Sequence, residues 1–330
     1  MVTVHFKDVG QGDSILLEWS REGENIIGII DCNLIGSYNP TLEYLKTKPT
    51  ARIEFIILTH FHSDHFSGMA DIFEYCIEKD IRVNSFYHSI GQFVSEIYNR
   101  IFTSKKLEVQ VERFFKVYNL FDDFVEDKIQ VSAHLAKLHL ENNVFLSFLA
   151  PVGKIYDEMA KQLSRKVNKI ATTPVDVNKL STIILIENDN QSIILTSDAV
   201  KKSFKKIRNR ISSQVILSQA PHHGSVKSLD DIFWLGLDKT EKCPVVFSVG
   251  NEPKDKLPNL ETVAFFDNND FDVYSTNFVF GVSDYFGLGT SIAGVSPRTK
   301  ILNSFSKLRK SRSDNIRNDK FNGDKMFRFW

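Results

Sequence analysis

The sequence has few of the features that mark secreted, membrane-embedded or strongly charged proteins. Its 330 residues include only three cysteines, Cys32, Cys76 and Cys243, and no CxxC spacing, which argues against a disulfide framework. No run approaches the ~20 apolar residues of a membrane helix, and the first residues lack the regions of a signal peptide. Basic and acidic residues balance at 41 each. We therefore expect a cytoplasmic globular protein without a membrane partner.

One short loop concentrates potential metal ligands. His60, His62, Asp64 and His65 directly follow the apolar run 53–58, which predicts a buried strand. Imidazole and carboxylate ligands suit zinc, manganese or iron. Alternate residues of an extended loop share a face, so His60 and His62 can bind one ion while Asp64 and His65 turn to a second. Two ions about 3.5–4 Å apart would share a bridging oxygen and generate hydroxide for hydrolysis.

Three further segments place polar side chains where a strand is expected to end. Asp31 follows the apolar residues 26–30, Asp198 follows 192–195, and His222 and His223 follow 215–217. A carboxylate at Asp31 is well placed to accept the second N–H of a ligand histidine and fix its tautomer. An ordinary turn residue at a strand end is the alternative reading of Asp31.

The order of these motifs resembles the metallo-β-lactamase-fold hydrolases, whose HxHxDH signature is matched here without substitution. The subgroup that it resembles in particular is the soluble β-lactamase-like domain of the DNA-uptake channel ComEC and its stand-alone relatives. The matching segments are 8–14, 29–31, 59–65, 195–198 and 220–225, and the resemblance covers roughly residues 2–80 and 143–280. ComEC is embedded in a membrane, so this chain resembles a soluble relative.

Periodicity by itself indicates only an α/β protein, and the resemblance adds an αββα sandwich with a helical insertion. The expected division is a domain over 1–290, with the insertion at about 85–142, and a basic C-terminal tail over 291–330 whose composition favours partial disorder. Strands are expected near 2–6, 14–19, 26–31, 53–58, 144–149, 183–187, 192–196, 214–218, 244–249 and 272–275. Helices are expected near 66–79, 154–170, 199–209 and 259–267.

The resemblance also implies roles for individual residues. The implied metal ligands are His60, His62, Asp64, His65, Asp198, His222 and His223, with Asp198 as the bridge between two ions. Asp64, Asp198, His222 and His223 form the implied catalytic set. Asp13 and Asp31 would support ligands from behind, and Gly224 and Ser225 would lie beside the substrate, where glycine lets the backbone approach closely. One or two divalent ions are implied, zinc first and manganese as an alternative.

Two departures from the subgroup pattern affect the metal count. Leu257 stands where relatives usually carry a histidine before a proline, and leucine cannot bind a metal. His88, His134 and His139 lie in segments that we interpret as helical, so none of them is expected to replace the missing ligand. The remaining set suffices for two ions, the second more open and weaker, or for one stable ion and another that arrives with substrate.

The charge distribution favours an anionic substrate. Six basic residues and no acid fall within 201–210, namely Lys201, Lys202, Lys205, Lys206, Arg208 and Arg210. A helix there would present a cationic face close to the metals and attract a phosphodiester. The sequence thus predicts a metal-dependent phosphodiesterase or nuclease that uses a metal-bound hydroxide. A hydrolase of another ester or amide, and a binding or regulatory module with a degenerate site, remain as alternatives.

The segment 85–142 is the least explained part of the sequence. Aromatic and aliphatic residues recur at helical spacing around 93–102 and, more loosely, around 114–121. Core packing is the usual reason for such a pattern. Because the segment follows the histidine-rich loop, it is also a candidate lid or a surface for a protein partner.

Overall fold

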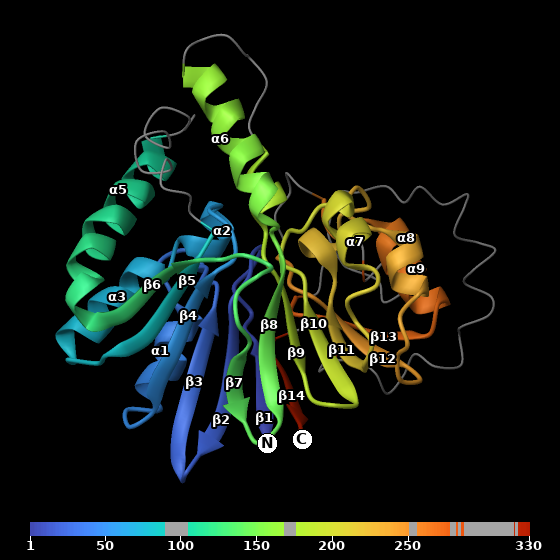
Figure 1. The fold of residues 1–330 in the computed structure, drawn as a ribbon, viewed down its shortest axis with the longest axis horizontal. Coiled ribbons are helices and arrows are strands. Elements are labelled where there is room, and N and C mark those ends of the chain that lie inside the picture. The colour runs from blue at the N-terminus through green and yellow to red at the C-terminus, as the bar shows by residue number, and fades with distance from the viewer. Residues whose placement is uncertain are drawn as a thin grey trace, which may run out of the picture.

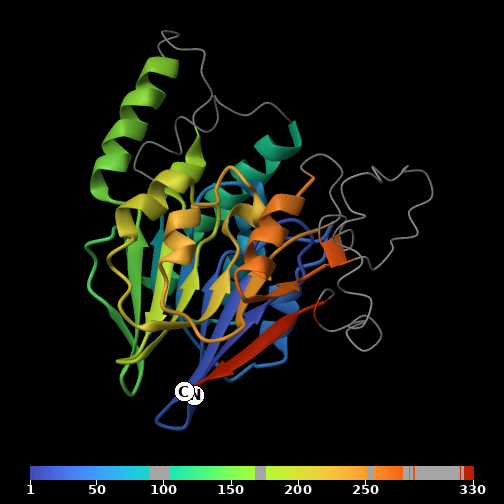
Figure 2. The same ribbon diagram turned by 90° about the vertical axis from the view of Figure 1, so that its right-hand side faces the viewer.

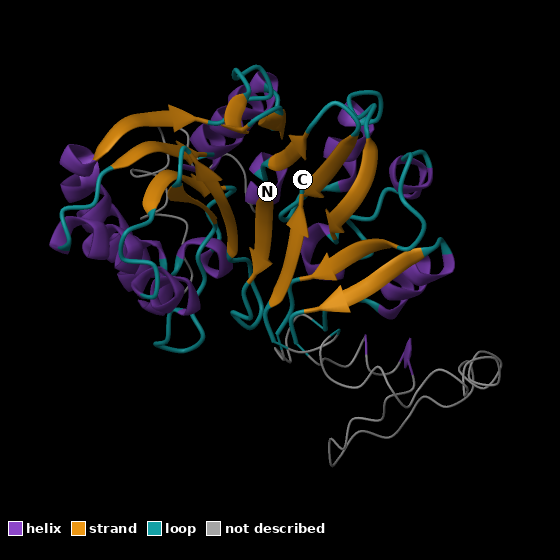
Figure 3. Cartoon of the chain, turned by 90° about the horizontal axis from the view of Figure 1, so that it is seen from below, coloured by secondary structure: helices purple, strands orange, loops and turns teal. Residues whose placement is uncertain are grey.

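A computed structural model of the chain shows two seven-stranded mixed sheets packed face to face with helices on both outer sides (Figures 1 and 3). The structure describes residues 1–89, 105–167, 176–250, 256–277 and 323–330, together with Val282, Tyr285, Phe286 and Lys320. The expected αββα sandwich is confirmed. No helix in these described ranges is long and apolar enough to cross a bilayer.

The first sheet has the order β14-β1-β2-β3-β4-β5-β6. Its strands are β1 (Val2–Phe6), β2 (Ile15–Arg21), β3 (Glu24–Ile30), β4 (Arg52–Leu58), β5 (Val83–His88), β6 (Val125–Gln130) and β14 (Lys325–Phe329). The pairs from β14 to β3 are antiparallel, and those from β3 to β6 are parallel. Strands β3 and β4 are apolar on both faces because each face is covered, by the second sheet on one side and by helices on the other.

The second sheet repeats this plan in the order β13-β12-β11-β10-β9-β8-β7. Its strands are β7 (Leu138–Glu141), β8 (Val144–Ala150), β9 (Ile183–Glu187), β10 (Gln191–Leu195), β11 (Gln214–Gln219), β12 (Cys243–Phe247) and β13 (Phe271–Ser275). The strands from β7 to β10 pair antiparallel, and those from β10 to β13 pair parallel. The carboxyl ends of the parallel strands therefore meet at one edge of each sheet.

Three apolar clusters hold the four layers together. One fills the space between the sheets, with Phe55, Ile57, Ile193 and Leu217 among its members. The helices α1 (Pro40–Lys46), α2 (Ser63–Phe66), α3 (Met69–Glu78) and α5 (Lys105–Leu120) cover the first sheet, and α7 (Lys201–Ile207), α8 (Asp231–Leu235) and α9 (Leu260–Asn268) cover the second. Helix α6 (Gly153–Val167) rises beyond the sheets on the side of α2 and α5 (Figure 1).

The segment 85–142 differs from the helical insertion expected there. It contains α5, but it also holds most of β5 and all of β6 and β7, so it contributes to both sheets. Strand β6 was not predicted from the sequence because it is an edge strand with polar side chains, here Glu126, Asp127 and Lys128. His88 and His139 accordingly lie in strands, and His134 lies in a turn, none of them in a helix. The spacing noted around 93–102 lies outside the described residues.

The end of the chain also departs from the expected boundary at 290. Strand β14 pairs antiparallel with β1 along its whole length, and the termini lie side by side (Figure 2). Asp324 fastens this strand further, because its carboxylate forms an ion pair with Lys7 and accepts the Asp8 N–H at 2.7 Å. The last residues of the expected tail thus belong to the first sheet, while 298–319, which hold most of its basic residues, lie outside the described residues.

Candidate metal centre

The histidine-rich loop leaves the carboxyl end of β4, where the parallel strands of both sheets end. His62 is extended, and Ser63–Phe66 form the short helix α2, so the backbone changes direction between His62 and Asp64. Phe61 points to the other side and packs against Phe66, Phe114 and Phe115, with ring centroids 4.2, 5.1 and 5.5 Å apart. Helix α5 therefore supports the loop from behind.

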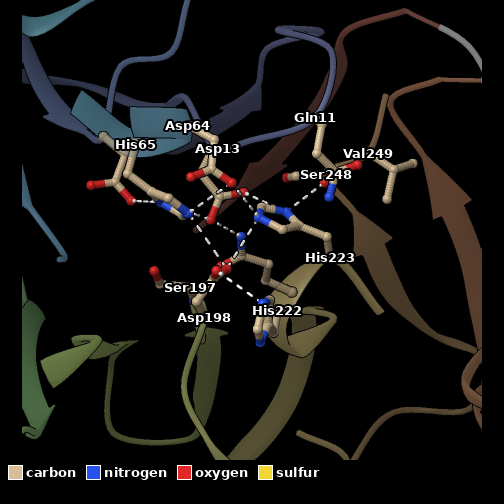
Figure 4. Close-up of polar contacts among 12 residues, drawn as sticks. Gln11, Asp13, Asp64, His65, Ser197, Asp198, His222, His223, Ser248 and Val249 are labelled. Carbon is tan, nitrogen blue, oxygen red and sulfur yellow. Dashed lines mark hydrogen bonds and ion pairs between the residues drawn. The ribbon is translucent and has the colours of Figure 1, made fainter. Parts of the chain in front are cut away.

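Four ligand atoms from three different loops converge next to α2 (Figure 4). The His223 Nε2 atom lies 3.2 Å from Asp198 Oδ1 and 3.3 Å from Asp64 Oδ2, and the His65 Nε2 atom lies 3.5 and 3.9 Å from the same two oxygens. A tetrahedral zinc ion with ligands at about 2.0–2.1 Å separates those ligands by about 3.4 Å. The spacing of the four atoms fits such an ion.

A second group of ligand atoms lies on the other side of Asp198. The His60 Nε2 atom is 3.0 Å from His62 Nδ1 and 3.7 Å from Asp198 Oδ2. The Nε2 atom of His222 approaches the same Oδ2 at 3.4 Å, and 28% of the His222 side chain is exposed. One carboxylate thus presents Oδ1 to the first group and Oδ2 to the second, which is the arrangement that a bridging ligand requires.

The buried atoms of the first group have no hydrogen-bond partner of their own. His65 Nε2, Asp198 Oδ1 and His223 Nε2 all belong to side chains that are at most 3% exposed, and each is without a hydrogen bond in the described structure. Unpaired polar atoms are costly inside a protein. Because these three point at one another and at Asp64, a divalent cation would satisfy all of them at once.

Burial and neighbouring charges shift the pKa values of the potential ligands. Burial disfavours charge on His65 and His223, but the Asp198 carboxylate raises the pKa of both, that of His223 to about 10. Burial alone would raise the pKa of Asp198, but His223 and His65 hold it well below its usual range. Burial lowers the pKa of His60 and His62, so these rings are neutral, the form that binds metal. A cation would displace protons from the first group.

The expected supporting carboxylates lie behind the ligands. Asp31 Oδ2 accepts a hydrogen bond from His65 Nδ1 at 2.7 Å, and this orients the ring with Nε2 toward Asp198. Burial raises the Asp31 pKa to about 6. Asp13 lies 3.7 Å from His65 Nδ1 and 4.0 Å from His223 Nδ1, so it adds negative charge behind both rings.

Three supporting residues were missed in the sequence. The Gln219 amide donates to Asp13 Oδ2 at 2.8 Å and accepts the N–H groups of Thr196 and Ser197, both at 2.9 Å. It therefore joins Asp13 to the turn that presents Asp198. The hydroxyls of Thr59 and Ser197 are 2.7 Å apart next to His60. Their position could have indicated this role, because each lies at or just after the end of a strand that leads to a predicted ligand.

The loop that contains Gly12 approaches the histidine-rich loop closely. Gly12 has a φ of +133°, and a Cβ atom there would lie 2.3 Å from the Asp64 carbonyl oxygen. The next residue, Asp13, donates its N–H to this oxygen at 3.0 Å. Only glycine permits this approach, which brings Asp13 to the site.

Gly224 is constrained by packing, and its expected position beside the substrate stays a prediction. A Cβ atom at this position would meet Pro258 at 2.5 Å and Phe247 at 2.7 Å, so the glycine is required for packing within the protein. Ser225 is buried and donates its N–H to the His222 carbonyl. Leu257, which stands where relatives carry a histidine, directly precedes Pro258. It therefore lies next to the turn that contains Gly224. None of His88, His134 and His139 belongs to a group of potential ligands in the described ranges.

Residues 8–155 match the family model of the metallo-beta-lactamase superfamily. The chain has the metallo-β-lactamase fold. The narrower resemblance to ComEC stays a prediction. A search among curated proteins found no match.

The chain is also similar to several solved structures. The metallo-beta-lactamase fold protein YhfI from Bacillus subtilis is 9% identical over 84% of this chain and 96% of its own, with a TM-score of 0.46. Zn(2+)-bound PqqB from Methylobacterium extorquens is 8% identical over 83% and 98%, with a TM-score of 0.45. Human tRNase Z, short form, is 11% identical over 67% and 77%, with a TM-score of 0.34.

The basic stretch forms α7, which begins three residues after Asp198. Lys201, Lys202, Lys205 and Lys206 are exposed, while Phe204 and Ile207 pack on the second sheet. The structure adds two acids that the sequence stretch lacks, since Asp231 lies 3.3 Å from Lys201 and Asp230 lies 2.6 Å from Arg208. Within the described ranges, Lys202, Lys205 and Lys206 have no such partner.

Proposed function

We propose that the protein is a metal-dependent hydrolase, and that its substrate is a phosphodiester or nucleic acid. The observation that carries the hydrolase assignment is the sharing of Asp198 between two groups of ligand atoms. Asp64, His65, Asp198 and His223 would hold one divalent ion, and His60, His62 and the second oxygen of Asp198 would hold another. Such ions would supply a water activated at neutral pH and positive charge opposite a developing oxyanion.

The exposure of the ligands indicates how substrate reaches the centre. His60, His65, Asp198 and His223 are buried, whereas 32% of the Asp64 side chain and 28% of the His222 side chain are accessible. The open side is therefore the side of Asp64 and His222. His222 can donate a hydrogen bond from this side to an oxygen that gains charge in the reaction.

The choice of a phosphodiester depends on charge. Lys202, Lys205 and Lys206 project from the exposed face of α7, a helix that follows Asp198 directly and lies at the same end of the sheets as α2 (Figure 1). An anionic polymer would be attracted to this face before its scissile group reaches the ions. A neutral ester or lactam would gain nothing from these three unpaired lysines.

A panel of substrates tests the proposal. We expect the zinc- or manganese-loaded protein to hydrolyse bis(p-nitrophenyl) phosphate, single-stranded DNA or RNA, and a chelator to abolish this turnover. Hydrolysis of p-nitrophenyl acetate or nitrocefin in place of all phosphodiesters would assign another ester or amide as the substrate. Absence of any turnover in the metal-loaded protein would favour a binding module instead.

Removal of the unpaired lysines tests the choice of substrate. Replacing Lys202, Lys205 and Lys206 by glutamine should weaken nucleic-acid binding and flatten its salt dependence, since each lost phosphate contact removes about 0.7–0.9 from the log–log slope. Turnover of bis(p-nitrophenyl) phosphate should stay near that of the parent, because this small substrate carries a single charge. Fluorescence anisotropy at several salt concentrations measures both quantities.

The matched control replaces Lys46, Lys79 and Lys242 by glutamine. These lysines are exposed and precede the parallel strands β4, β5 and β12, so they lie at the end of the sheets opposite to the ligands. Nucleic-acid binding by this variant should match that of the parent. Equal binding and equal salt slopes in both triple variants would remove the support that α7 gives to a nucleic-acid substrate.

A further inference from the structure

A chain of buried side chains connects the two groups of ligands behind the metal centre. It runs from His65 through Asp31, Thr59 and Ser197 to His60. Thr59 Oγ1 lies 2.6 Å from Asp31 Oδ2 and 2.7 Å from Ser197 Oγ. The His60 Nδ1 atom lies 3.3 Å from the Thr59 hydroxyl and 3.4 Å from the Ser197 hydroxyl. All five side chains are at most 3% exposed.

The donors and acceptors of this chain can be assigned in only one direction. Asp31 is an acceptor, so the Thr59 hydroxyl donates to it and has only lone pairs left for its other neighbours. The Ser197 hydroxyl must then donate to Thr59. Neither oxygen has a proton left for His60, so His60 Nδ1 is the donor, shared between the two oxygens. His60 is thereby fixed with its Nε2 lone pair toward Asp198, as His65 is by Asp31.

The backbone of Thr59 is also held in place by hydrogen bonds at its N–H and its carbonyl. Its N–H donates to Asp31 Oδ1 at 2.8 Å, and its carbonyl accepts from the Thr182 N–H at 3.1 Å and from the Thr182 hydroxyl at 3.0 Å. Thr59 follows β4 of the first sheet, whereas Thr182 precedes β9 and Ser197 follows β10 of the second. The chain therefore connects the two sheets at the edge that carries the ligands.

Ser197 has a backbone conformation that serine disfavours. Its φ is +45°, in the left-handed region where glycine is the favoured residue. The side chain gives this position a use that glycine lacks, because its hydroxyl completes the link between Thr59 and His60. Ser197 lies directly beside Asp198 in Figure 4.

We infer that Thr59 and Ser197 are positioning residues that let one carboxylate, Asp31, set the tautomer and orientation of histidines in both ligand groups. The inference rests on the proposed metal centre and adds residues that the ligand motif does not contain. Loss of either hydroxyl leaves every ligand in place, but it breaks the link between Asp31 and His60 or leaves His60 Nδ1 with a single acceptor, so the ring is held less firmly. Metal affinity should fall, although no ligand has been removed.

Cobalt(II) titration of the metal-free full-length protein tests the inference through its visible absorption bands. Thr59→Val, Ser197→Ala and Ser197→Gly should each weaken cobalt(II) binding by about 10- to 100-fold, the usual effect of removing an outer-shell partner. Thr59→Ser retains the hydroxyl and should bind cobalt(II) within about threefold of the parent and give the parent's spectrum, since only a methyl group is lost.

The two Ser197 variants separate positioning from stability. Both remove the hydroxyl, but glycine relieves the strain at a φ of +45° and alanine does not. In the metal-free state, Ser197→Gly should unfold at a higher temperature than Ser197→Ala, while both bind cobalt(II) equally weakly. The inference would be overturned if Ser197→Gly bound cobalt(II) more tightly than Ser197→Ala in line with its higher unfolding temperature. It would also be overturned if both variants bound cobalt(II) as tightly as the parent.

The parent protein distinguishes failure of the inference from failure of the proposed function. If the parent and the Ser197 variants bind cobalt(II) equally well, the positioning role alone is refuted. A parent that binds no cobalt(II) refutes the metal centre and, with it, the inference. Ser197→Gly also keeps the test decisive if Thr59→Val fails to fold, because relief of strain favours its folded state.

Discussion

Replacing Asp198 by asparagine is expected to remove most of the activity while leaving the fold intact. The amide keeps the shape of the side chain but loses the negative charge that faces His65 and His223 through Oδ1 and His60 and His222 through Oδ2. Because the change would weaken both proposed ion sites, kcat/KM should fall by about 1,000-fold or more, equivalent to about 4 kcal/mol of transition-state stabilisation. Elemental analysis and turnover of bis(p-nitrophenyl) phosphate measure the two losses.

A second buried aspartate provides the matched control. Asp230 is fully buried on α8, where it pairs with Arg208 and caps the helix by accepting the Phe233 N–H at 2.9 Å. Asp230→Asn should lower the thermal stability, as the loss of a buried charged partner does, yet retain metal and turnover. Asp198→Asn with the turnover of the parent would exclude the model of two ions that share a carboxylate.

Removing one ligand from each group should abolish metal binding. His62→Ala takes a ring nitrogen from the second group and Asp64→Ala takes a carboxylate from the first, so the double variant leaves both incomplete. A zinc site with four ligands is worth about 10–16 kcal/mol, so each lost ligand should weaken its ion on the order of 100- to 1,000-fold. Elemental analysis after dialysis, with circular dichroism to confirm folding, measures the result.

The matched control for this variant is His134→Ala with Asp157→Ala. Both residues are exposed, and both lie outside the groups of potential ligands in the described ranges. Metal content and activity should equal those of the parent. Stoichiometric metal retained by the His62 and Asp64 double variant would show that the ligand assignment is wrong.

The sequence by itself predicted most of the potential ligands and the strands that present them. An apolar run buried on both faces, as in β3 and β4, can be recognised without tertiary information because each side chain is covered. Polar residues directly after such runs, at Asp31, His60 and Asp198, could therefore be placed at one edge. The expected separation of His60 and His62 from Asp64 and His65 agrees with the two groups of potential ligands, because the backbone turns into helix α2 after His62.

Only the tertiary structure decided the features that depend on neighbours distant in the sequence. The polar edge strand β6 has no clear apolar pattern, and β14 is a five-residue strand distant in the sequence from its partner; each is placed in the sheet by pairing with β5 or β1. The acids beside α7, the packing reason for Gly224 and the chain from Asp31 through Thr59 and Ser197 to His60 each join segments more than 20 residues apart. A hydroxyl or a glycine has the same sequence signature in any turn, and its role is fixed only by the atom that the fold brings within 3 Å of it.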